Sequence, residues 1–229
     1  MTKSRILVWD APTRVFHWAL ALSFVGAFVT ADSERLRDVH VVLGYTVFGL
    51  IAFRLIWGVL GTRYARFTSF AFGPRDVVTY LKSLLTLRPQ HFLGHNPAGS
   101  IAIYALLALG LLTGLSGYAH YNELGGEWLE DLHEGLANAM LAVVFVHIAG
   151  VIVSSLLHRE NLARAMVTGY KTGDPGGAIR GARWIVAALL VAGIAALWTG
   201  VVPVIDTTPG ASTMAASRPV KHSEHDRSR

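Results

Sequence analysis

The sequence predicts an all-α integral membrane protein, in which a bundle of four transmembrane helices is followed by a fifth C-terminal transmembrane helix. Hydrophobic residues make up 52% of the chain and charged residues only 15%, whereas soluble domains carry roughly 25% charged residues. The few charged residues also gather between long apolar runs, and the connecting segments alternate between basic and acidic. These two patterns are typical of a chain that crosses a membrane several times.

Five apolar runs are close to the length of about 20 residues that a transmembrane helix needs. We expect helices over residues 15–31, 39–60, 101–119, 132–157 and 184–205. The first four form a bundle spanning residues 15–160. A shorter helix at about 76–87 should lie on the membrane surface, because its apolar residues recur at helical spacing between charged ones. Residues 206–229 are small, polar and mixed in charge, and are expected to form a disordered tail.

The basic residues predict which ends of the helices face the cytoplasm. The leader at residues 1–14, the connection at 61–100 and the loop at 161–183 are rich in Lys and Arg, whereas the connections at 32–38 and 120–131 are rich in acids. By the positive-inside rule, the N-terminus is cytoplasmic and the tail is periplasmic, in a bacterial inner membrane. The same rule explains the net charge of +5, so we expect no nucleic-acid binding.

The chain contains no cysteine, which excludes disulfides, Cys-ligated iron–sulfur clusters and covalent attachment of c-type haem. Among its ten histidines, His133 and His147 are 14 residues apart in one expected helix. That spacing corresponds to about 21 Å along the axis and to directions within about 40° of each other. An ionisable residue inside a membrane helix is costly and indicates a function.

Two further histidines match these two in depth. His17 lies near the cytoplasmic end of its helix, at the level of His147, and we call these two the inner pair. His40 opens its helix at the outer face, at the level of His133, and we call these two the outer pair. Paired imidazoles from facing helices are what a b-type haem needs as axial ligands. The sequence therefore predicts two non-covalent haem b groups, each with bis-histidine iron.

Arg54 falls in the second half of an apolar run, at the level of the inner pair. A haem propionate could neutralise its guanidinium, or the side chain could snorkel to the cytoplasmic surface. Three glycines, Gly110, Gly114 and Gly117, give the helix at 101–119 a small face for close packing. The remaining histidines lie in loops, at helix ends or in the tail and are interpreted as non-ligating: His91, His95, His120, His158, His222 and His225.

Four stretches of the chain resemble one known family. They are Val8-Trp-Asp-Ala-Pro-Thr-Arg-Val-Phe-His17-Trp, His40-Val-Val-Leu-Gly44, Arg54-Leu-Ile-Trp-Gly58 and Gly94-His-Asn-Pro-Ala-Gly99. With the spacing of His133 and His147, they are similar to the bacterial cytochrome b561 / nickel-iron hydrogenase cytochrome b subunit family over about residues 5–170. The resemblance implies a four-helix membrane bundle with two b haems. By position it assigns His17 and His147 to the inner haem iron, and His40 and His133 to the outer one.

The function expected from these features is electron transfer across the membrane between membrane quinone and a periplasmic redox partner, such as a c-type cytochrome. The acidic outer loops would dock a basic partner. One alternative is a membrane-anchor cytochrome b subunit of a hydrogenase or another periplasmic oxidoreductase, with the same haems. A second alternative, from another class, is a haem-free metal-binding or transport protein that uses the same histidines. No residue is assigned a catalytic role.

Overall fold

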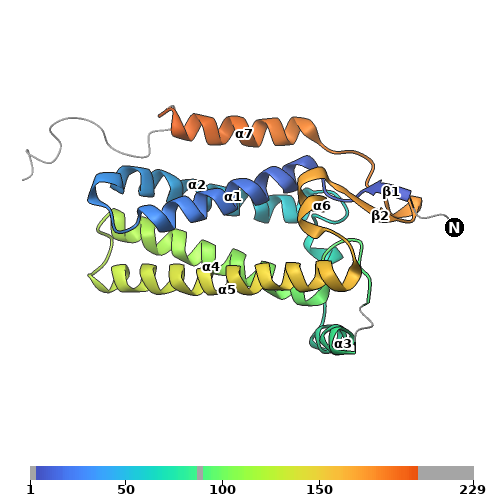
Figure 1. The fold of residues 1–229 in the computed structure, drawn as a ribbon. Coiled ribbons are helices and arrows are strands. Elements are labelled where there is room, and N and C mark those ends of the chain that lie inside the picture. The colour runs from blue at the N-terminus through green and yellow to red at the C-terminus, as the bar shows by residue number, and fades with distance from the viewer. Residues whose placement is uncertain (1–3, 87–89, 201–229) are drawn as a thin grey trace, which may run out of the picture.

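A computed structural model describes residues 4–86 and 90–200 of the chain. Its main body is a bundle of four long helices that lie side by side (Figure 1). They are α1 (Ala11–Thr30), α2 (Arg37–Leu60), α4 (Pro97–Tyr121) and α5 (Trp128–His158). Each is long and apolar enough to cross a membrane, the second together with the short 3-10 helix η1 (Glu34–Leu36) before it. The bundle has the all-helical architecture that the sequence predicts.

Three of these helices, α1, α4 and α5, begin four residues before the apolar runs, and polar side chains cap the first two. The Asp10 carboxylate accepts a hydrogen bond from Thr13 N at 2.8 Å at the start of α1, and Asn96 Oδ1 accepts one from Gly99 N at 2.7 Å at the start of α4. A proline follows within the first turn of both helices. An Asp or Asn cap followed by proline is a strong start signal for a helix.

The bundle core consists of apolar side chains from all four helices. Its buried members are Phe16, Phe24, Val47, Leu50, Ile51, Leu107 and Met140. Helix α4 packs closely along α5 and α2, and two of its glycines make this possible. A Cβ atom at Gly110 would clash with Ile51, and one at Gly114 would clash with Phe48. The packing role predicted for these glycines is therefore confirmed.

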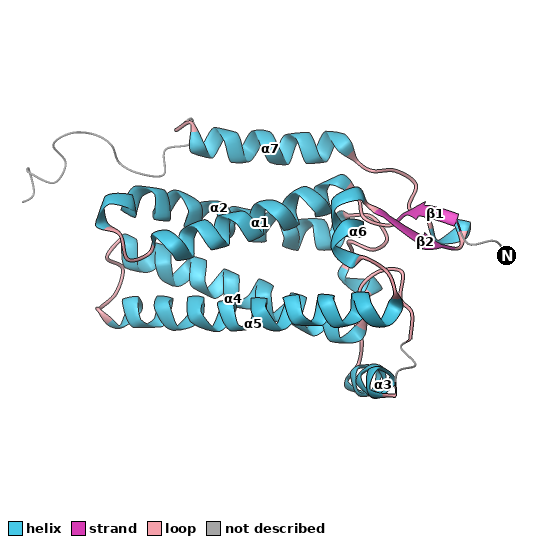
Figure 2. Ribbon diagram, in the orientation of Figure 1, coloured by secondary structure: helices cyan, strands magenta, loops and turns pink. Residues whose placement is uncertain are grey.

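One end of the bundle, which we call the inner end, carries a small cap that the sequence did not indicate. Strand β1 (Ser4–Leu7) pairs antiparallel with β2 (Tyr170–Gly173), with Ser4 opposite Gly173. Two short helices flank the strands: α6 (Leu162–Thr168) and η3 (Pro175–Gly177). A further short helix, η2 (Phe67–Ser69), packs against the bundle core through Phe67. Segments expected to be a simple leader and a loop thus form ordered structure. Helix α3 (Pro74–Leu85) crosses the same end of the bundle at a steep angle (Figure 2).

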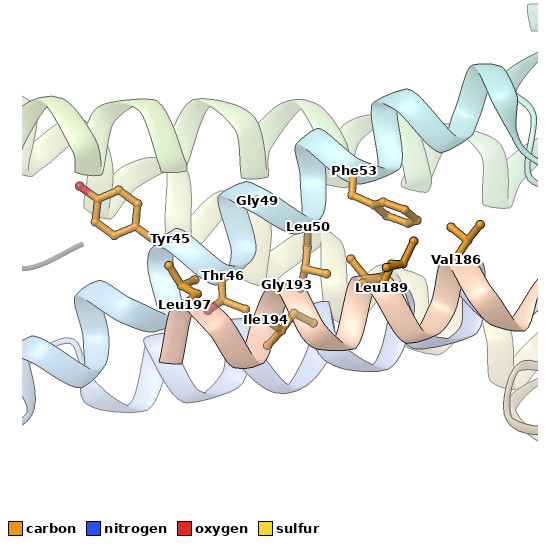
Figure 3. Close-up of a pocket in the computed structure, with 11 residues that line it drawn as sticks. Tyr45, Thr46, Gly49, Leu50, Phe53, Val186, Leu189, Gly193, Ile194 and Leu197 are labelled. Atoms are coloured by element: carbon orange, nitrogen blue, oxygen red, sulfur yellow. The ribbon is translucent and has the colours of Figure 1, made fainter. Parts of the chain in front are cut away.

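The last described helix, α7 (Trp184–Trp198), lies along α1 and α2, on the side away from α4 and α5 (Figure 1). Its 15 residues span about 22 Å, less than the roughly 30 Å of a bilayer core. The expected end of this span at 201–205 and the tail at 206–229 lie outside the described residues. An apolar groove of about 360 Å³ separates α7 from α2, and Gly49 and Gly193 line it (Figure 3).

Candidate functional site

The structure brings the outer pair together at the end of the bundle opposite the cap. His40 comes from α2 and His133 from α5, and their ring centroids are 6.2 Å apart with an interplanar angle of 81°. Two imidazole nitrogens bound to opposite sides of one metal ion, each at about 2.1 Å, place the ring centroids roughly 6 to 6.5 Å apart. The outer pair has this spacing.

Backbone carbonyls fix the orientation of both outer rings. His40 Nδ1 donates to Ala27 O at 2.8 Å, and His133 Nδ1 donates to Thr113 O at 3.0 Å. Because the hydrogen of each neutral ring is used at Nδ1, the lone pair of each Nε2 atom is left for another partner. A metal-ligating histidine is held in its tautomer by this kind of contact. The rings are therefore prepared to act as ligands through Nε2.

The inner pair lies nearer the cap, and its members come from α1 and α5. His17 and His147 interact electrostatically with each other. His17 meets Trp18 edge-on, with ring centroids 5.0 Å apart, and its Nδ1 atom is buried without a hydrogen-bond partner. Helix α5 thus supplies one histidine to each pair, 14 residues apart, as the sequence predicts.

Arg54 is buried near the inner pair and does not snorkel, because only 3% of its surface is exposed. Its guanidinium carbon lies 4.8 Å from the ring centre of Phe67 and 5.8 Å from that of Phe70. One Nη atom has no hydrogen-bond partner, although Asp10 lies within electrostatic range. A buried cation with an unused donor favours an anionic partner.

His95, which the sequence places in a loop and which is interpreted there as non-ligating, is packed between two aromatic rings. Its ring lies between those of Trp9, at 4.7 Å, and Phe70, at 4.5 Å, and its Nδ1 atom is buried without a partner. Burial, and next the charge of Arg54, lower the pKa of His95 to about 3, so the ring is neutral. The only sequence signal for it is the Gly94-His-Asn-Pro turn before α4.

Buried polar side-chain atoms without partners gather beside the inner pair. Those at the inner end belong to Thr13, Arg14, His17, Arg54 and His95, and a further one belongs to Thr113 beside the outer pair. Since buried polar groups in proteins are normally hydrogen-bonded, such a concentration indicates a polar ligand. The propionates of a haem are groups of this kind.

The residues at both sites fit haem better than a metal ion held by the protein alone. No group of three or more His, Cys, Asp or Glu side chains suited to a metal ion occurs within residues 4–86 and 90–200. Each site offers two imidazoles, which suffice for haem iron because the macrocycle provides the other four ligands.

The sequence profile of the prokaryotic cytochrome b561 family matches residues 8–169. The chain belongs to this family. The match includes both histidine pairs, Arg54 and His95, and it ends before α7. It confirms the family predicted from the four sequence stretches. With the four apolar helices, it makes this cytochrome b561 a multi-pass bacterial membrane protein that carries electrons through haem b.

Relatives of this cytochrome b561 carry the name "Probable Ni/Fe-hydrogenase B-type cytochrome subunit". The protein from Cupriavidus necator is 26% identical over 213 residues, covering 72% of this chain and 86% of the relative. The protein from Rhodobacter capsulatus is 24% identical and covers 74% of this chain and 82% of the relative. That from Azotobacter vinelandii is also 24% identical, with coverages of 74% and 89%. No solved structure matches the chain.

Proposed function

We propose that this cytochrome b561 conducts electrons across the inner membrane through two haem b groups. His17 and His147 would ligate the inner haem iron, and His40 and His133 the outer one. The observation that carries the proposal is the outer pair, whose ring separation of 6.2 Å accommodates a metal ion and whose Nδ1 atoms are both engaged by carbonyls. Haem supplies reversible one-electron chemistry, and bis-histidine ligation leaves no open position for oxygen.

The residues around the histidines would orient and neutralise the cofactors. The carbonyl groups of Ala27 and Thr113 hold the outer rings in place and raise the basicity of Nε2. Arg54, fixed between Phe67 and Phe70 by cation–π contacts, would pair with a propionate of the inner haem. Along α5 the two sites are separated by about 21 Å, so one haem would lie near each face of the membrane.

We further propose that the outer haem exchanges electrons with a periplasmic protein and the inner haem with membrane quinone. The connection between α4 and α5 and the first turns of α5 carry five exposed acids and no Lys or Arg: Glu123, Glu127, Glu130, Asp131 and Glu134. Such a surface attracts a basic partner, such as a c-type cytochrome, and orients it near the outer pair.

A hydrogenase is the second candidate for the periplasmic partner, because the relatives are named as hydrogenase cytochrome subunits. In that case the chain would be a membrane anchor, with the same haems and the same quinone side. Purification without crosslinking from the native membrane distinguishes the two candidates. A stable, large hydrogenase subunit would copurify with an anchor, whereas a c-type cytochrome would dissociate at high ionic strength.

The first test is a reduced-minus-oxidised visible spectrum of the purified protein, together with a pyridine haemochrome count. Two b haems per chain are expected. A protein that inserts in the membrane but takes up no haem under haem-replete expression would contradict the proposal. Its four histidines would then belong to a haem-free metal-binding or transport protein.

Substitution of one ligand tests the assignment of the pairs. His147→Ala should remove about half of the haem and leave the outer site filled, because α5 holds the two sites about 21 Å apart. The matched control is His120→Ala, which changes an exposed histidine at the end of α4 and should leave the haem count unchanged. Loss of both haems from a correctly inserted His147→Ala protein would mean that the sites do not fill independently.

A further inference from the structure

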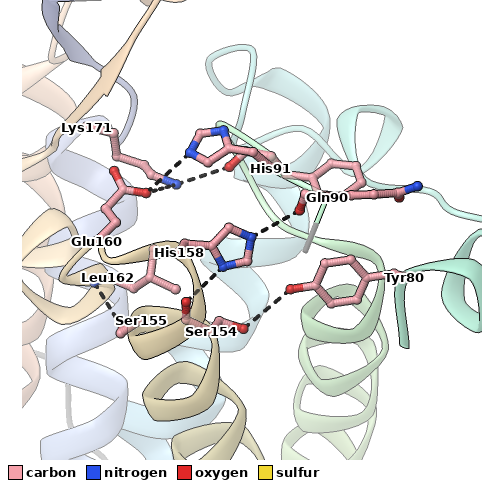
Figure 4. Close-up of polar contacts among 10 residues, drawn as sticks. Tyr80, Gln90, His91, Ser154, Ser155, His158, Glu160, Leu162 and Lys171 are labelled. Carbon is pink, nitrogen blue, oxygen red and sulfur yellow. Dashed lines mark hydrogen bonds and ion pairs between the residues drawn. The ribbon is translucent and has the colours of Figure 1, made fainter. Parts of the chain in front are cut away.

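A second group of polar side chains lies at the inner end, outside both histidine pairs (Figure 4). We call it the inner polar cluster, and its members are Tyr80, His91, Ser154, His158, Glu160 and Lys171. They come from α3, the segment before α4, the end of α5 and strand β2. The proposed electron path uses none of them.

At the centre of the inner polar cluster is the Glu160 carboxylate. It lies 3.1 Å from Lys171 Nζ, and only 3% of the Lys171 side chain is exposed. Lys171 Nζ also donates to Phe92 O at 3.1 Å. On the other side, Glu160 lies 3.7 Å from His91 Nε2, and the His91 side chain is 46% exposed. The carboxylate therefore connects a solvent-facing imidazole with a buried ammonium group.

His158 is held between two acceptors. Its Nδ1 atom is 2.8 Å from Ser154 O, and its Nε2 atom is 3.1 Å from Gln90 O. A neutral imidazole has a single N–H donor, so the ring can donate to only one of these two carbonyl groups at a time. Its centroid lies 5.8 Å from that of His91.

A cavity of about 30 Å³ lies among these side chains, and Gly94 and Asn96 also border it. A polar cavity of this size holds one or two water molecules. Between Gly94 and Asn96 in the chain is His95, which interacts electrostatically with Lys171, Arg54 and both members of the inner pair. Protonatable groups and room for water therefore extend from the surface at His91 to Gly94 and Asn96, the chain neighbours of His95.

Quinone chemistry requires such a route. Reduction of a quinone to a quinol takes up two electrons and two protons, and oxidation releases them, whereas haem iron carries electrons alone. The core of the bundle is apolar, so the protons must come from water at the inner end. We propose that the inner polar cluster is the proton path between this water and the quinone that exchanges electrons with the inner haem. This inference rests on the quinone exchange proposed above.

In this path, protons enter at His91 and pass to Glu160, and water in the cavity connects Glu160 with the inner site. Lys171 pairs with the Glu160 carboxylate at 3.1 Å, and His158 hydrogen-bonds to the carbonyl groups of Ser154 and Gln90 beside the cavity. Burial raises the pKa of Tyr80, whose hydroxyl is hydrogen-bonded to Ser154 Oγ at 3.4 Å, so the phenol stays protonated. An ion pair that served folding alone would need neither the two imidazoles nor the cavity. The charged and titratable groups around Glu160 are Tyr80, His91, His95, His158, Arg159 and Lys171.

The decisive variant is Glu160→Gln, which keeps the size and hydrogen bonding of the side chain but cannot carry a proton. The probe is decylubiquinone, added to the haem-loaded protein in proteoliposomes. We expect turnover with the quinone to fall by about tenfold or more, and its solvent isotope effect in D₂O to rise. Haem content and the midpoint potentials of both haems should stay unchanged. Glu160→Asp should retain most of the turnover, and Asp174→Asn, at an exposed acid outside the inner polar cluster, is the matched control.

A second readout does not depend on turnover. The infrared difference spectrum between the quinone-reduced and oxidised states should contain a carboxyl signal that Glu160→Gln abolishes and Asp174→Asn retains. If the Glu160→Gln protein does not insert in the membrane, His91→Gln serves as the test of the proton path. His91→Gln should slow quinone turnover in weak buffer, and added imidazole should restore it.

Two results would overturn the proton path in different ways. If the wild-type protein reacts with decylubiquinone and the variants match it in rate, pH profile and isotope effect, the path is wrong while the proposed function stands. If the protein with two haems does not exchange electrons with the quinone at all, the quinone half of the proposed function fails, and the path fails with it.

Discussion

The orientation of His133 depends on a single glycine of the facing helix. The ring packs against Gly117 of α4, and a Cβ atom added there would lie 2.7 Å from His133 Cε1 and 2.9 Å from Nδ1. The Nδ1 atom also donates to Thr113 O, one turn earlier on α4. Helix α4 therefore supplies both the space and the acceptor that set the outer ring, although it contributes no histidine to either pair.

Gly117→Ala should consequently empty the outer site. The methyl group would push the His133 ring away from His40, while the inner pair, about 21 Å away along α5, would be unaffected. We expect loss of about half of the haem by pyridine haemochrome count, the amount that one of two bis-histidine sites holds. Gly135→Ala is the control, because a Cβ atom at Gly135 meets nothing within 4 Å. A full haem count in Gly117→Ala would show that the ring can move aside without losing its partner.

The side chain of Asp10 links two helices, because it joins the start of α1 to the end of α2. Its carboxylate is 1% exposed and accepts hydrogen bonds from Thr13 N at 2.8 Å, Thr62 Oγ1 at 2.6 Å and Trp57 Nε1 at 3.2 Å. It also lies within electrostatic range of Arg54. One side chain thus caps a helix, ties two helices together and offsets a buried cation.

Asp10→Ala should therefore destabilise the bundle more than the loss of a side chain that only caps a helix. A helix cap contributes about 1 kcal/mol, and each hydrogen bond to a charged group about 1.5–3 kcal/mol, so we expect a loss of about 3 kcal/mol or more. The measurement is the midpoint of unfolding of the detergent-solubilised protein. Asp32→Ala, at an exposed position in the outer connection, is the control. A midpoint equal to that of the control would mean that the cost of burying the Asp10 carboxylate cancels the stabilisation from its hydrogen bonds.

Helix α7 packs less tightly than the four bundle helices. A Cβ atom at Gly193 of α7 meets nothing within 4 Å, whereas one at Gly110 of α4 clashes with Ile51. The side chain introduced by Gly193→Leu should extend into the groove beside α2, so the unfolding midpoint should stay unchanged or rise. Gly110→Leu should lower stability by about 1–3 kcal/mol, because it overpacks a filled core. Equal effects of the two substitutions would mean that α7 lies closer to α2 in the membrane than the groove suggests.

The sequence predicts the helices of the bundle well because each contains a long apolar run. The run is continuous because the side chains that face lipid are apolar, like those that face the core. Phe145, Val146 and Leu156 on α5 are examples of such exposed apolar residues. It does not predict the starts of α1 and α4, since capping residues and prolines interrupt the apolar pattern. The strands of the cap have only four residues each, and their pairing joins segments more than 160 residues apart, so no local pattern reveals them.

Site residues on the long helices could likewise be predicted from the sequence, whereas those in the connecting segments could not. His40 and His133 could be matched from sequence, because helical geometry converts their positions into depths. His95 could not, because it lies in a turn whose position is set by contacts with Trp9 and Phe70 from distant segments. The inner polar cluster draws on four such segments, and the partner of Glu160 within it, Lys171, belongs to β2, a strand of four residues that the sequence does not reveal.

The pairing of β1 with β2 restricts how many times the whole chain can cross the membrane between these strands. Because β1 pairs with β2, residues 4–7 and 170–173 lie at the same end of the bundle, and the four long helices lie between them in the chain. The chain therefore crosses the membrane an even number of times between the two strands. The basic connections lie at this inner end and the acidic ones at the other, so the positive-inside rule predicts a cytoplasmic location for the cap.

Single cysteines can test this orientation and the proposed fifth crossing, because the chain has none of its own. Ala31→Cys is exposed at the outer end, Thr68→Cys is exposed at the inner end, and Ser212→Cys lies beyond α7. A membrane-impermeant maleimide applied to intact spheroplasts should label Ala31→Cys at once and Thr68→Cys only after lysis. If α7 crosses the membrane, Ser212→Cys should behave like Ala31→Cys. Labelling of Ser212→Cys only after lysis would mean that α7 does not cross, and that its 15 residues lie against α1 and α2 without reaching the outer face.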